Sequence, residues 1–440
     1  MGIFKAYDIR GIVPADFNAE IAYRIGRAIP HVLGAKSVVV GRDMRTTGPE
    51  IAGAVMRGIA DSGADAFDMG LCTTPMNYFA TGFGGYGAGI MVTASHNPAE
   101  YNGVKMSREG AAPVSYESGI GEIEKLVTGE LPPKAEAPGK ISSVDHWPDC
   151  KAHFMKYAEG IAPLKVAVDT GNGMSGKFLP ELFAELPCEL VPLYFELDGT
   201  FPNHEANPLK RENMLDLMAK VKEVSADIGI AFDGDGDRCM FVDERGEIVS
   251  SDLITALIAR EVLPQHEGAS IIYDLRSSRV VPEEIKAGGG VPIETRVGHS
   301  FMKGVMREND VPFGGELSGH YYFREHYCSD SAELAMLAML RILSKSGKKL
   351  SELIQPLRRY HATGEVNFEV DDKDARIEKL AEAFADGEQS RLDGLTVRYE
   401  DWWFNVRKSN TEPVLRLNLE ADTAERRDEA RARVEAAIKG

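Results

Sequence analysis

The sequence predicts an α/β protein with three related mixed α/β domains, followed by a smaller C-terminal α+β domain. The chain has 440 residues, which is more than one ordinary hydrophobic core accommodates. The order of a β-branched apolar run, a polar loop and a helical pattern occurs three times. The tail breaks this order, because its strand patterns follow one another directly.

Each of the three repeated runs ends at or beside an aspartate. A buried strand, a loop and a helix in succession are typical of α/β units. A further strand is expected in the third copy at residues 292–296. The strands and their helices are expected at residues 37–43 with 50–62, 164–169 with 180–186, and 270–274 with 281–287.

The tail reads as a strand, a helix, three strands and a charged closing helix. Strands in direct succession indicate antiparallel pairing, which favours an α+β domain. These elements are expected at residues 364–370, 375–385, 395–400, 403–408, 414–420 and 423–438.

Candidate linkers are rich in proline, glycine or polar residues, and lie at residues 131–139, 243–246 and 358–364. They divide the chain into four expected domains. The boundaries are residues 1–146, 147–246, 247–360 and 361–440.

Composition excludes several classes of function. The formal net charge of -18 argues against a nucleic-acid binder, which needs a basic face. The 5 cysteines are scattered, which argues against a disulfide framework or a zinc site. No secretory signal and no run of about 18 apolar residues is visible. A cytoplasmic, soluble, multidomain protein without nucleic-acid, membrane or obligate protein partners is therefore expected.

The sharpest chemical signal is Asp233-Gly-Asp235-Gly-Asp237-Arg238, which follows an apolar run at residues 228–232. Three carboxylates so close together repel one another unless a cation lies between them. Oxygen ligands favour Mg²⁺ or Ca²⁺. An EF-hand is excluded, because Arg238 stands where that loop needs glycine and a strand precedes the motif. A magnesium site is expected.

A second signal is Thr93-Ala-Ser95-His96-Asn-Pro98, at the end of another apolar run. A serine at the exit of a buried strand is well placed as an exposed nucleophile. A Ser–His hydrolase is disfavoured, because adjacent serine and histidine rarely meet as nucleophile and base, and no GxSxG motif is present. A simple serine turn stays open for this motif taken alone.

Two later loops carry side chains suited to binding sugar hydroxyls and a phosphate group. In an extended loop at residues 314–320, Glu316, Ser318 and His320 would share one face and could bind neighbouring hydroxyls. The loop at residues 407–413 combines arginine with serine, asparagine and threonine, as a phosphate cradle does. A capping loop and a hairpin turn are the alternatives.

Together and in this order, these loops resemble the α-D-phosphohexomutase family, in its phosphomannomutase/phosphoglucomutase branch. The resemblance covers nearly the whole chain. Three further motifs add to it, at residues 5–11, 101–105 and 298–300.

The resemblance implies a role for each matching residue. Ser95 would be the phosphoserine, and a phosphate oxygen on Ser95 would hold Mg²⁺ together with Asp233, Asp235 and Asp237. Arg10, Lys105 and Arg238 would flank the transferring phosphoryl group, with Tyr7 nearby. Lys105 and His320 are the candidates for general acid or base.

The remaining implied roles concern the sugar and its distal phosphate. Glu316 and Ser318 would read O3 and O4, supported by His299 and His320. Arg276 stands where a substrate-binding lysine is expected. The distal phosphate would be held by Arg407, Ser409, Asn410 and Thr411.

The implied roles assign the four domains, in order, to the phosphoserine nucleophile, the metal, the sugar and a phosphate-binding lid. The implied reaction interconverts hexose 1-phosphate and hexose 6-phosphate of mannose or glucose, through a 1,6-bisphosphosugar. Small sugar phosphates are thus the expected partners. Alternatives are a phosphoglucosamine mutase, a metal-dependent sugar phosphatase and a non-catalytic sugar-phosphate-binding protein.

Overall fold

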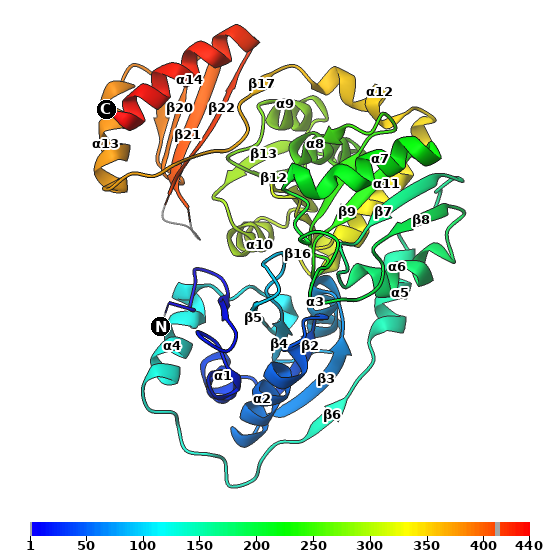
Figure 1. Cartoon of the computed structure of the whole chain (residues 1–440), viewed down its shortest axis with the longest axis vertical. Coiled ribbons are helices and arrows are strands. Elements are labelled where there is room, and N and C mark those ends of the chain that lie inside the picture. Colours follow the sequence, from blue (N-terminus) through cyan, green and yellow to red (C-terminus); the bar gives the residue numbers. More distant parts are fainter. Residues whose placement is uncertain (1, 410–413) are drawn as a thin grey trace.

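The computed structural model describes residues 2–409 and 414–440, and its strands form four sheets that follow one another along the chain (Figure 1). We call each sheet with its helices a unit. In Figure 1 the first unit, blue to cyan, lies at one end of the molecule, and the fourth, orange to red, lies beside the third at the other.

The first unit has a mixed sheet in the order β1-β5-β4-β2-β3-β6. Its helices are α1 (Ala19–Leu33), α2 (Gly48–Asp61), α3 (Thr74–Phe83) and α4 (Gly121–Thr128). Its strands are β1 (Ile9–Ile12), β2 (Ser37–Arg42), β3 (Asp65–Leu71), β4 (Ala88–Val92), β5 (Tyr101–Arg108) and β6 (Ile141–Ser143).

The second unit has the sheet order β11-β10-β9-β7-β8. Its helices are α5 (Trp147–Met155), α6 (Ser175–Phe183) and α7 (Leu215–Val224). Its strands are β7 (Lys165–Asp169), β8 (Glu189–Leu193), β9 (Ile228–Phe232), β10 (Cys239–Val242) and β11 (Ile248–Val249).

The third unit has the sheet order β13-β12-β14-β15-β16. Its helices are α8 (Ser251–Val262), α9 (Val280–Ala287), α10 (His299–Glu308), α11 (Ala332–Ser346) and α12 (Leu350–Ile354). Its strands are β12 (Ser270–Asp274), β13 (Val291–Thr295), β14 (Phe313–Gly315), β15 (Tyr321–Phe323) and β16 (Ser329–Asp330).

The fourth unit is an antiparallel sheet in the order β17-β22-β21-β20-β19, with β18 also paired to β22. Helices α13 (Lys373–Ala383) and α14 (Ala424–Lys439) belong to it. Its strands are β17 (His361–Ala362), β18 (Val366–Phe368), β19 (Glu388–Ser390), β20 (Leu395–Arg398), β21 (Trp402–Lys408) and β22 (Leu415–Ala421). The predicted fold class is confirmed, with three mixed sheets and a final antiparallel one.

The first three units share one strand arrangement, which explains how they build a common site. In each unit, three neighbouring strands run parallel (β4-β2-β3, β9-β7-β8 and β14-β12-β13), and the last of the three along the chain turns back into an antiparallel neighbour. Strand β6 extends the first set in parallel. The returning pairs are β4–β5, β9–β10 and β14–β15. The three loops that carry Ser95, the aspartates and Glu316 are therefore equivalent loops of three related sheets. Ligand sites of α/β sheets form at the carboxyl ends of such strands.

The hydrophobic cores divide the molecule differently from the sheets. One large apolar cluster combines the second and third units with side chains of the first, including Met76, Phe79 and Met91. The core of the fourth unit is a separate cluster around Trp402 and Phe404. The first three units are thus joined by shared apolar packing, whereas among the described residues the core of the fourth unit stays separate.

Some elements differ from the predicted ones. Helix α6 begins at Ser175 and carries Pro180 inside it, whereas the prediction began the helix at that proline. Strands β17 and β19 were missed, because both are short and largely polar and show no apolar alternation. Across the described ranges, no helix combines the length and apolar content that a membrane crossing needs.

Candidate active site

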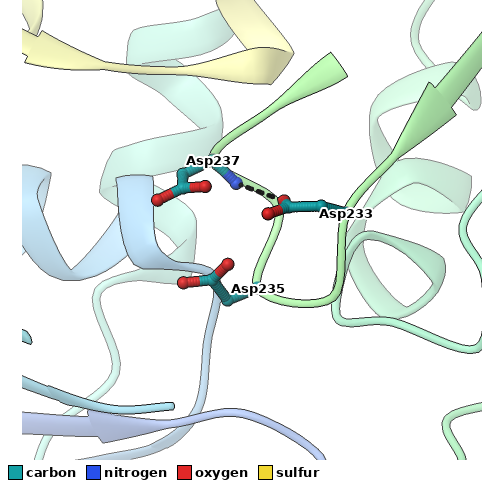
Figure 2. Close-up of side chains that lie close together, drawn as sticks. All are labelled: Asp233, Asp235 and Asp237. Carbon is teal, nitrogen blue, oxygen red and sulfur yellow. Dashed lines mark hydrogen bonds between the residues drawn. The ribbon is translucent and has the colours of Figure 1, made fainter. Parts of the chain in front are cut away.

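The three aspartates of the β9–β10 loop converge on one point (Figure 2). Their buried carboxylates offer ligand oxygens that all lie within 4.8 Å of one another. Gly236, with φ of 74°, allows the tight turn that brings them together. Asp233 Oδ1 accepts the backbone N–H of Asp237 at 3.1 Å, the bond drawn in Figure 2, and that of Arg238 at 3.2 Å.

The electrostatics of this cluster favour a bound cation. Burial, together with repulsion from Asp237 and Asp235, raises the pKa of the Asp233 carboxyl well above its usual range. Oδ1 of Asp235 and Oδ1 of Asp237 are buried, and neither accepts a hydrogen bond from the part of the chain that the structure describes. Two orphaned carboxylate oxygens beside a third carboxylate are a hard-oxygen donor set that fits Mg²⁺.

Lys105 neutralises part of this charge from strand β5. Its ammonium lies 2.7 Å from Asp235 Oδ2 and also contacts Asp237 Oδ2. Burial alone would lower the pKa of Lys105, but the two carboxylates outweigh burial and raise it. Lys105 thus offsets part of the negative charge that the three carboxylates bring together.

Ser95 lies in the β4–β5 loop, against the aspartates. Its Oγ is 2.8 Å from Asp233 Oδ2, and its backbone has a φ of 51°. The sequence-based expectation of an exposed serine is wrong, because only 1% of the residue is accessible. The facing Asp233 loop covers the hydroxyl that the first unit would otherwise present to solvent.

The argument against contact between Ser95 and His96 also fails geometrically. Ser95 Oγ lies 3.1 Å from His96 Nδ1, because the left-handed backbone at Ser95 turns the two neighbouring side chains together. Burial, and then the nearby Arg238 and Arg10, lower the pKa of the His96 imidazole well below its usual range. Because the Ser95 hydroxyl donates to Asp233, a neutral His96 ring with its proton on Nδ1 can donate a hydrogen bond to Ser95 Oγ.

Cationic and aromatic side chains surround the same point. Arg10 donates to Asn97 Oδ1 at 2.5 Å and to Asp8 Oδ2 at 2.6 Å. Arg238 places Nε 3.1 Å from His320 Nε2 and 3.8 Å from Asp233 Oδ2. The structure therefore brings Arg238 and Lys105 to the aspartates.

Tyr7, from the first unit, meets the third unit in an edge contact. Its ring centroid lies 5.1 Å from that of His299, which begins helix α10. The first and third units thus approach each other across the predicted site.

The loop that carries Glu316, Ser318 and His320 is a turn, not the extended segment expected from sequence. Gly319 adopts a φ of 84° and donates its N–H to the Glu316 carbonyl, which closes the turn. Glu316 and His320 nevertheless converge, with His320 Nδ1 2.9 Å from Glu316 Oε2. Ser318 Oγ lies 3.1 Å from the same ring nitrogen.

The Glu316 carboxylate is held in place by its own protein partners. It accepts the Gly298 N–H at 3.0 Å and the Tyr322 hydroxyl at 2.6 Å. His320 also lies 3.5 Å from Asp237, so the predicted sugar loop adjoins the predicted metal loop.

Arg407, in strand β21, is buried and pairs with Glu365 at 3.1 Å. Arg276 Nη1 lies 3.9 Å from the same carboxylate, while its Nη2 is 2.7 Å from Asp274. Arg407 and Arg276 therefore come together at the boundary of the third and fourth units. Ser409 follows at the end of β21, and the predicted residues Asn410 and Thr411 lie outside the described residues.

Family models for phosphoglucomutase/phosphomannomutase match the chain in domain order. The models of alpha/beta/alpha domains I, II and III match residues 1–132, 145–246 and 250–360, and the C-terminal domain model matches 365–437. The chain belongs to this family. Members are isomerases of carbohydrate metabolism, and the chain is accordingly a phosphohexomutase-type enzyme.

Individual proteins give the same assignment. A phosphomannomutase of Salmonella montevideo is 40% identical over 433 residues, covering 95% of this chain and 94% of its own. A crystal structure of a phosphoglucomutase/phosphomannomutase family protein from Burkholderia thailandensis has a TM-score of 0.92 at 36% identity, covering 99% of this chain and 97% of its own.

An N-acetylphosphoglucosamine mutase of Aspergillus fumigatus, solved with GlcNAc-6P and magnesium, has a TM-score of 0.65 at 16% identity. The match covers 99% of this chain and 95% of that one. At this identity the likeness shows a shared fold.

The candidate site includes residues that sequence reasoning missed. Thr74 begins helix α3 and donates its hydroxyl to Asp235 Oδ2 at 2.5 Å. Asp43 and Arg45, just after β2, hold the Ser95 loop from behind. The aspartate that ends each repeated strand was visible in the sequence, but its partners are too distant in the chain to be assigned from spacing.

Proposed function

We propose that this enzyme interconverts hexose 1-phosphate and hexose 6-phosphate of mannose and glucose through a phosphoserine at Ser95 and a 1,6-bisphosphosugar. The observation that carries the proposal is the 2.8 Å contact between Ser95 Oγ and Asp233, inside the carboxylate cluster. A serine beside a divalent-cation site and cationic side chains is the arrangement that phosphoryl transfer requires.

Phosphoryl transfer needs in-line positioning and neutralisation of charge. Mg²⁺, held by Asp233, Asp235 and Asp237, would supply part of that neutralisation. Lys105 and Arg238, both in contact with the aspartate loop, supply charge to the equatorial phosphate oxygens.

The first transfer breaks the bond between phosphorus and Ser95 Oγ and forms a bond to a free sugar hydroxyl. The hydroxyl proton ends on Ser95 Oγ, and Lys105 and His320 are the groups that we assign to its movement. The bisphosphosugar then reverses end for end. Its other phosphate returns to Ser95, and the sugar oxygen recovers a proton, so one cycle isomerises one hexose phosphate.

The far end of the substrate is assigned to the fourth unit. Arg407, with Ser409, Asn410 and Thr411, would bind the distal phosphate, and Arg276 adds charge from the third unit. Glu316 and Ser318 would bind O3 and O4, assisted by His299 and His320. Because these residues would bind O3 and O4 but not O2, both C2 epimers, mannose and glucose, would be accepted as substrates.

Incubation with mannose 1-phosphate, Mg²⁺ and a trace of glucose 1,6-bisphosphate, followed by ³¹P NMR, tests the proposal. We expect a 6-phosphate signal without free phosphate, with the rate reduced more than about 10³-fold in Ser95→Ala. Ser118→Ala, an exposed serine of the first unit, is the control.

Release of inorganic phosphate without isomerisation would contradict a mutase and indicate a phosphatase. Parallel reactions with glucose and glucosamine phosphates define the sugar. A preference above about 10³-fold for one of the two C2 epimers, or for glucosamine phosphate, would contradict the proposed reading of O3 and O4 alone.

A further inference from the structure

Arg45 is a buried arginine of the first unit that points into the Ser95 loop from behind. Only 1% of it is accessible. Its Nη1 donates to the carbonyls of Pro98 at 2.7 Å and Tyr101 at 2.9 Å. Its Nη2 donates to the carbonyls of Ser95 at 2.8 Å and Asn97 at 2.6 Å. One guanidinium thus binds four carbonyls of the segment that carries Ser95.

The N–H side of Ser95 is fixed by a neighbouring chain of hydrogen bonds. Ser95 N donates to Thr93 Oγ1 at 2.8 Å, and Thr93 Oγ1 donates to Asp43 Oδ2 at 2.6 Å. Asp43 in turn pairs with Arg45 at 3.3 Å. Both peptide groups of Ser95 are therefore held, which sustains its left-handed φ of 51°, a conformation that serine rarely adopts.

The second unit closes over this arrangement. The Phe201 ring lies 5.2 Å from the Arg45 guanidinium carbon, and a side chain at Gly199 would come within 2.7 Å of Arg45 Cα. A side chain at Gly234, between two of the aspartates, would come within 2.6 Å of the Ser95 carbonyl oxygen. The Ser95 carbonyl that Arg45 binds thus packs directly against Gly234 of the aspartate loop.

The related units keep the same strand arrangement without an arginine that binds loop carbonyls. In the third unit the equivalent residue, two positions after the strand-ending Asp274, is Arg276, which lies near Glu365. In the second unit the position is Gly171, two residues after Asp169. The four carbonyl contacts of Arg45 therefore serve the Ser95 loop and not the strand arrangement.

We propose that Arg45 is a positioning residue that fixes Ser95 Oγ relative to the Asp233 loop for phosphoryl transfer. The inference rests on the proposed function. The planar guanidinium presents paired donors from two nitrogens, whereas a lysine ammonium has three donors on one nitrogen and cannot span four carbonyls. Arg45 lies behind the loop, away from the assigned sugar and distal-phosphate residues, so its loss affects the transfer step and not substrate capture.

The test compares Arg45→Lys with Arg57→Lys, a control at an exposed position on helix α2. We expect Arg45→Lys to lower kcat by at least about 30-fold while KM for hexose 1-phosphate stays within about twofold. The rate at which glucose 1,6-bisphosphate phosphorylates Ser95, followed by intact-protein mass spectrometry, should fall in parallel. A kcat within twofold of the control, or a loss confined to KM, would overturn the inference.

Thr93→Val keeps the side-chain shape but removes the hydrogen bonds to Ser95 N and Asp43, and serves as a second variant if Arg45→Lys does not fold. It should show the same split between kcat and KM. If the wild-type enzyme accepts phosphate on Ser95 but isomerises no hexose phosphate, the proposed function fails while the phosphorylation rates still test Arg45. If neither variant slows that phosphorylation, the role of Arg45 is refuted with the mutase activity intact.

Discussion

The Ser95 loop and strand β21 with Arg407 form the two ends of the proposed substrate site, and different forces hold them. Around Ser95, three units share buried apolar packing, and Arg45 and Asp43 bind the loop through buried hydrogen bonds. Arg407 belongs to a unit with its own hydrophobic core. This unit contacts the third unit through ion pairs between side chains, such as Arg398 with Glu294.

The contacts of the fourth unit with the third are polar and partly exposed. Arg279 contacts Asp422 and donates to the Glu400 carbonyl at 3.0 Å. Arg398 pairs with Glu294 at 2.5 Å. Exposed ion pairs contribute about 0–1 kcal/mol each, far less than a shared apolar core.

The difference separates two tasks. The proposed nucleophile and metal ligands need fixed geometry, because a displacement of about 1 Å can cost about 10²-fold in rate. In the proposed mechanism, the distal cradle must accept either phosphate of an intermediate that reverses its orientation. A unit joined by polar contacts can open and close for that reversal, and closure would keep water from the phosphoserine.

Asp235→Asn should have the largest effect, because it acts at the end of the site that holds Ser95 and the three aspartates, which we call the fixed end. Removing one carboxylate from the donor set should lower turnover at least about 100-fold and raise the Mg²⁺ concentration for half-maximal activity. A coupled assay across a Mg²⁺ titration measures both, with Asp216→Asn, an exposed carboxylate, as control. Full activity in EDTA would refute the metal assignment.

Arg407→Met acts at the far end, and should change binding more than chemistry. Loss of a charge-assisted hydrogen bond of about 1.5–3 kcal/mol should raise KM about 10–100-fold, with a smaller change in kcat. Lys408→Met, on the exposed face of the same strand, should behave as wild type. If kcat alone fell, Arg407 would belong to the transfer step and the division between the two ends would fail.

Arg279→Met probes the joint between the third and fourth units. We expect kcat and KM to change together, by up to about fivefold, because the variant shifts the balance between open and closed forms. Phosphorylation of Ser95 by glucose 1,6-bisphosphate in the intact variant should show the same change in KM. Arg391→Met, whose ion pair with Glu378 stays within the fourth unit, is the control, and equal behaviour of the two variants would exclude a role for the joint.

Glu333→Gln tests the interior of the fixed end through pH. Glu333 accepts hydrogen bonds from Ser331 at 2.9 Å and Thr73 at 3.2 Å, and burial raises its pKa to about 7. Its carboxyl is therefore protonated more readily when folded, so stability should fall as pH rises from about 4.5 to 7 and then level off. The glutamine variant should be more stable than wild type by about 2–3 kcal/mol at pH 8, with little difference at pH 4.

Urea unfolding at the two pH values measures this difference. If the stability of the wild type relative to Glu333→Gln did not fall between pH 4 and pH 8, the buried carboxyl would ionise without a cost in stability. The fixed end would then be more hydrated than its packing indicates.

The sequence sufficed for the repeated strands and the acidic loop, because both depend on local patterns. The apolar run before Asp233 and the spacing of the three aspartates each act within a few residues. Prediction from sequence failed where packing between residues distant in the chain determines the structure. The burial of Ser95 depends on a loop 138 positions away, and the bonds from Arg45 to the Ser95 loop span about 50 residues.

Short polar elements were equally hard to predict. The Glu316 loop turns because Gly319 permits a left-handed backbone, a choice that the alternation of side chains does not reveal. Strand β19 pairs through its backbone while its side chains stay polar, so its sequence carries no apolar period.

The central claim is that Ser95 itself carries the transferred phosphoryl group. Glucose 1,6-bisphosphate labelled with ³²P, added without hexose phosphate, should place label on Ser95, as located by peptide mass spectrometry. Unlabelled mannose 1-phosphate should then carry the label from the protein into bisphosphosugar and hexose 6-phosphate. Isomerisation without label on Ser95, or label released only as inorganic phosphate, would contradict the account.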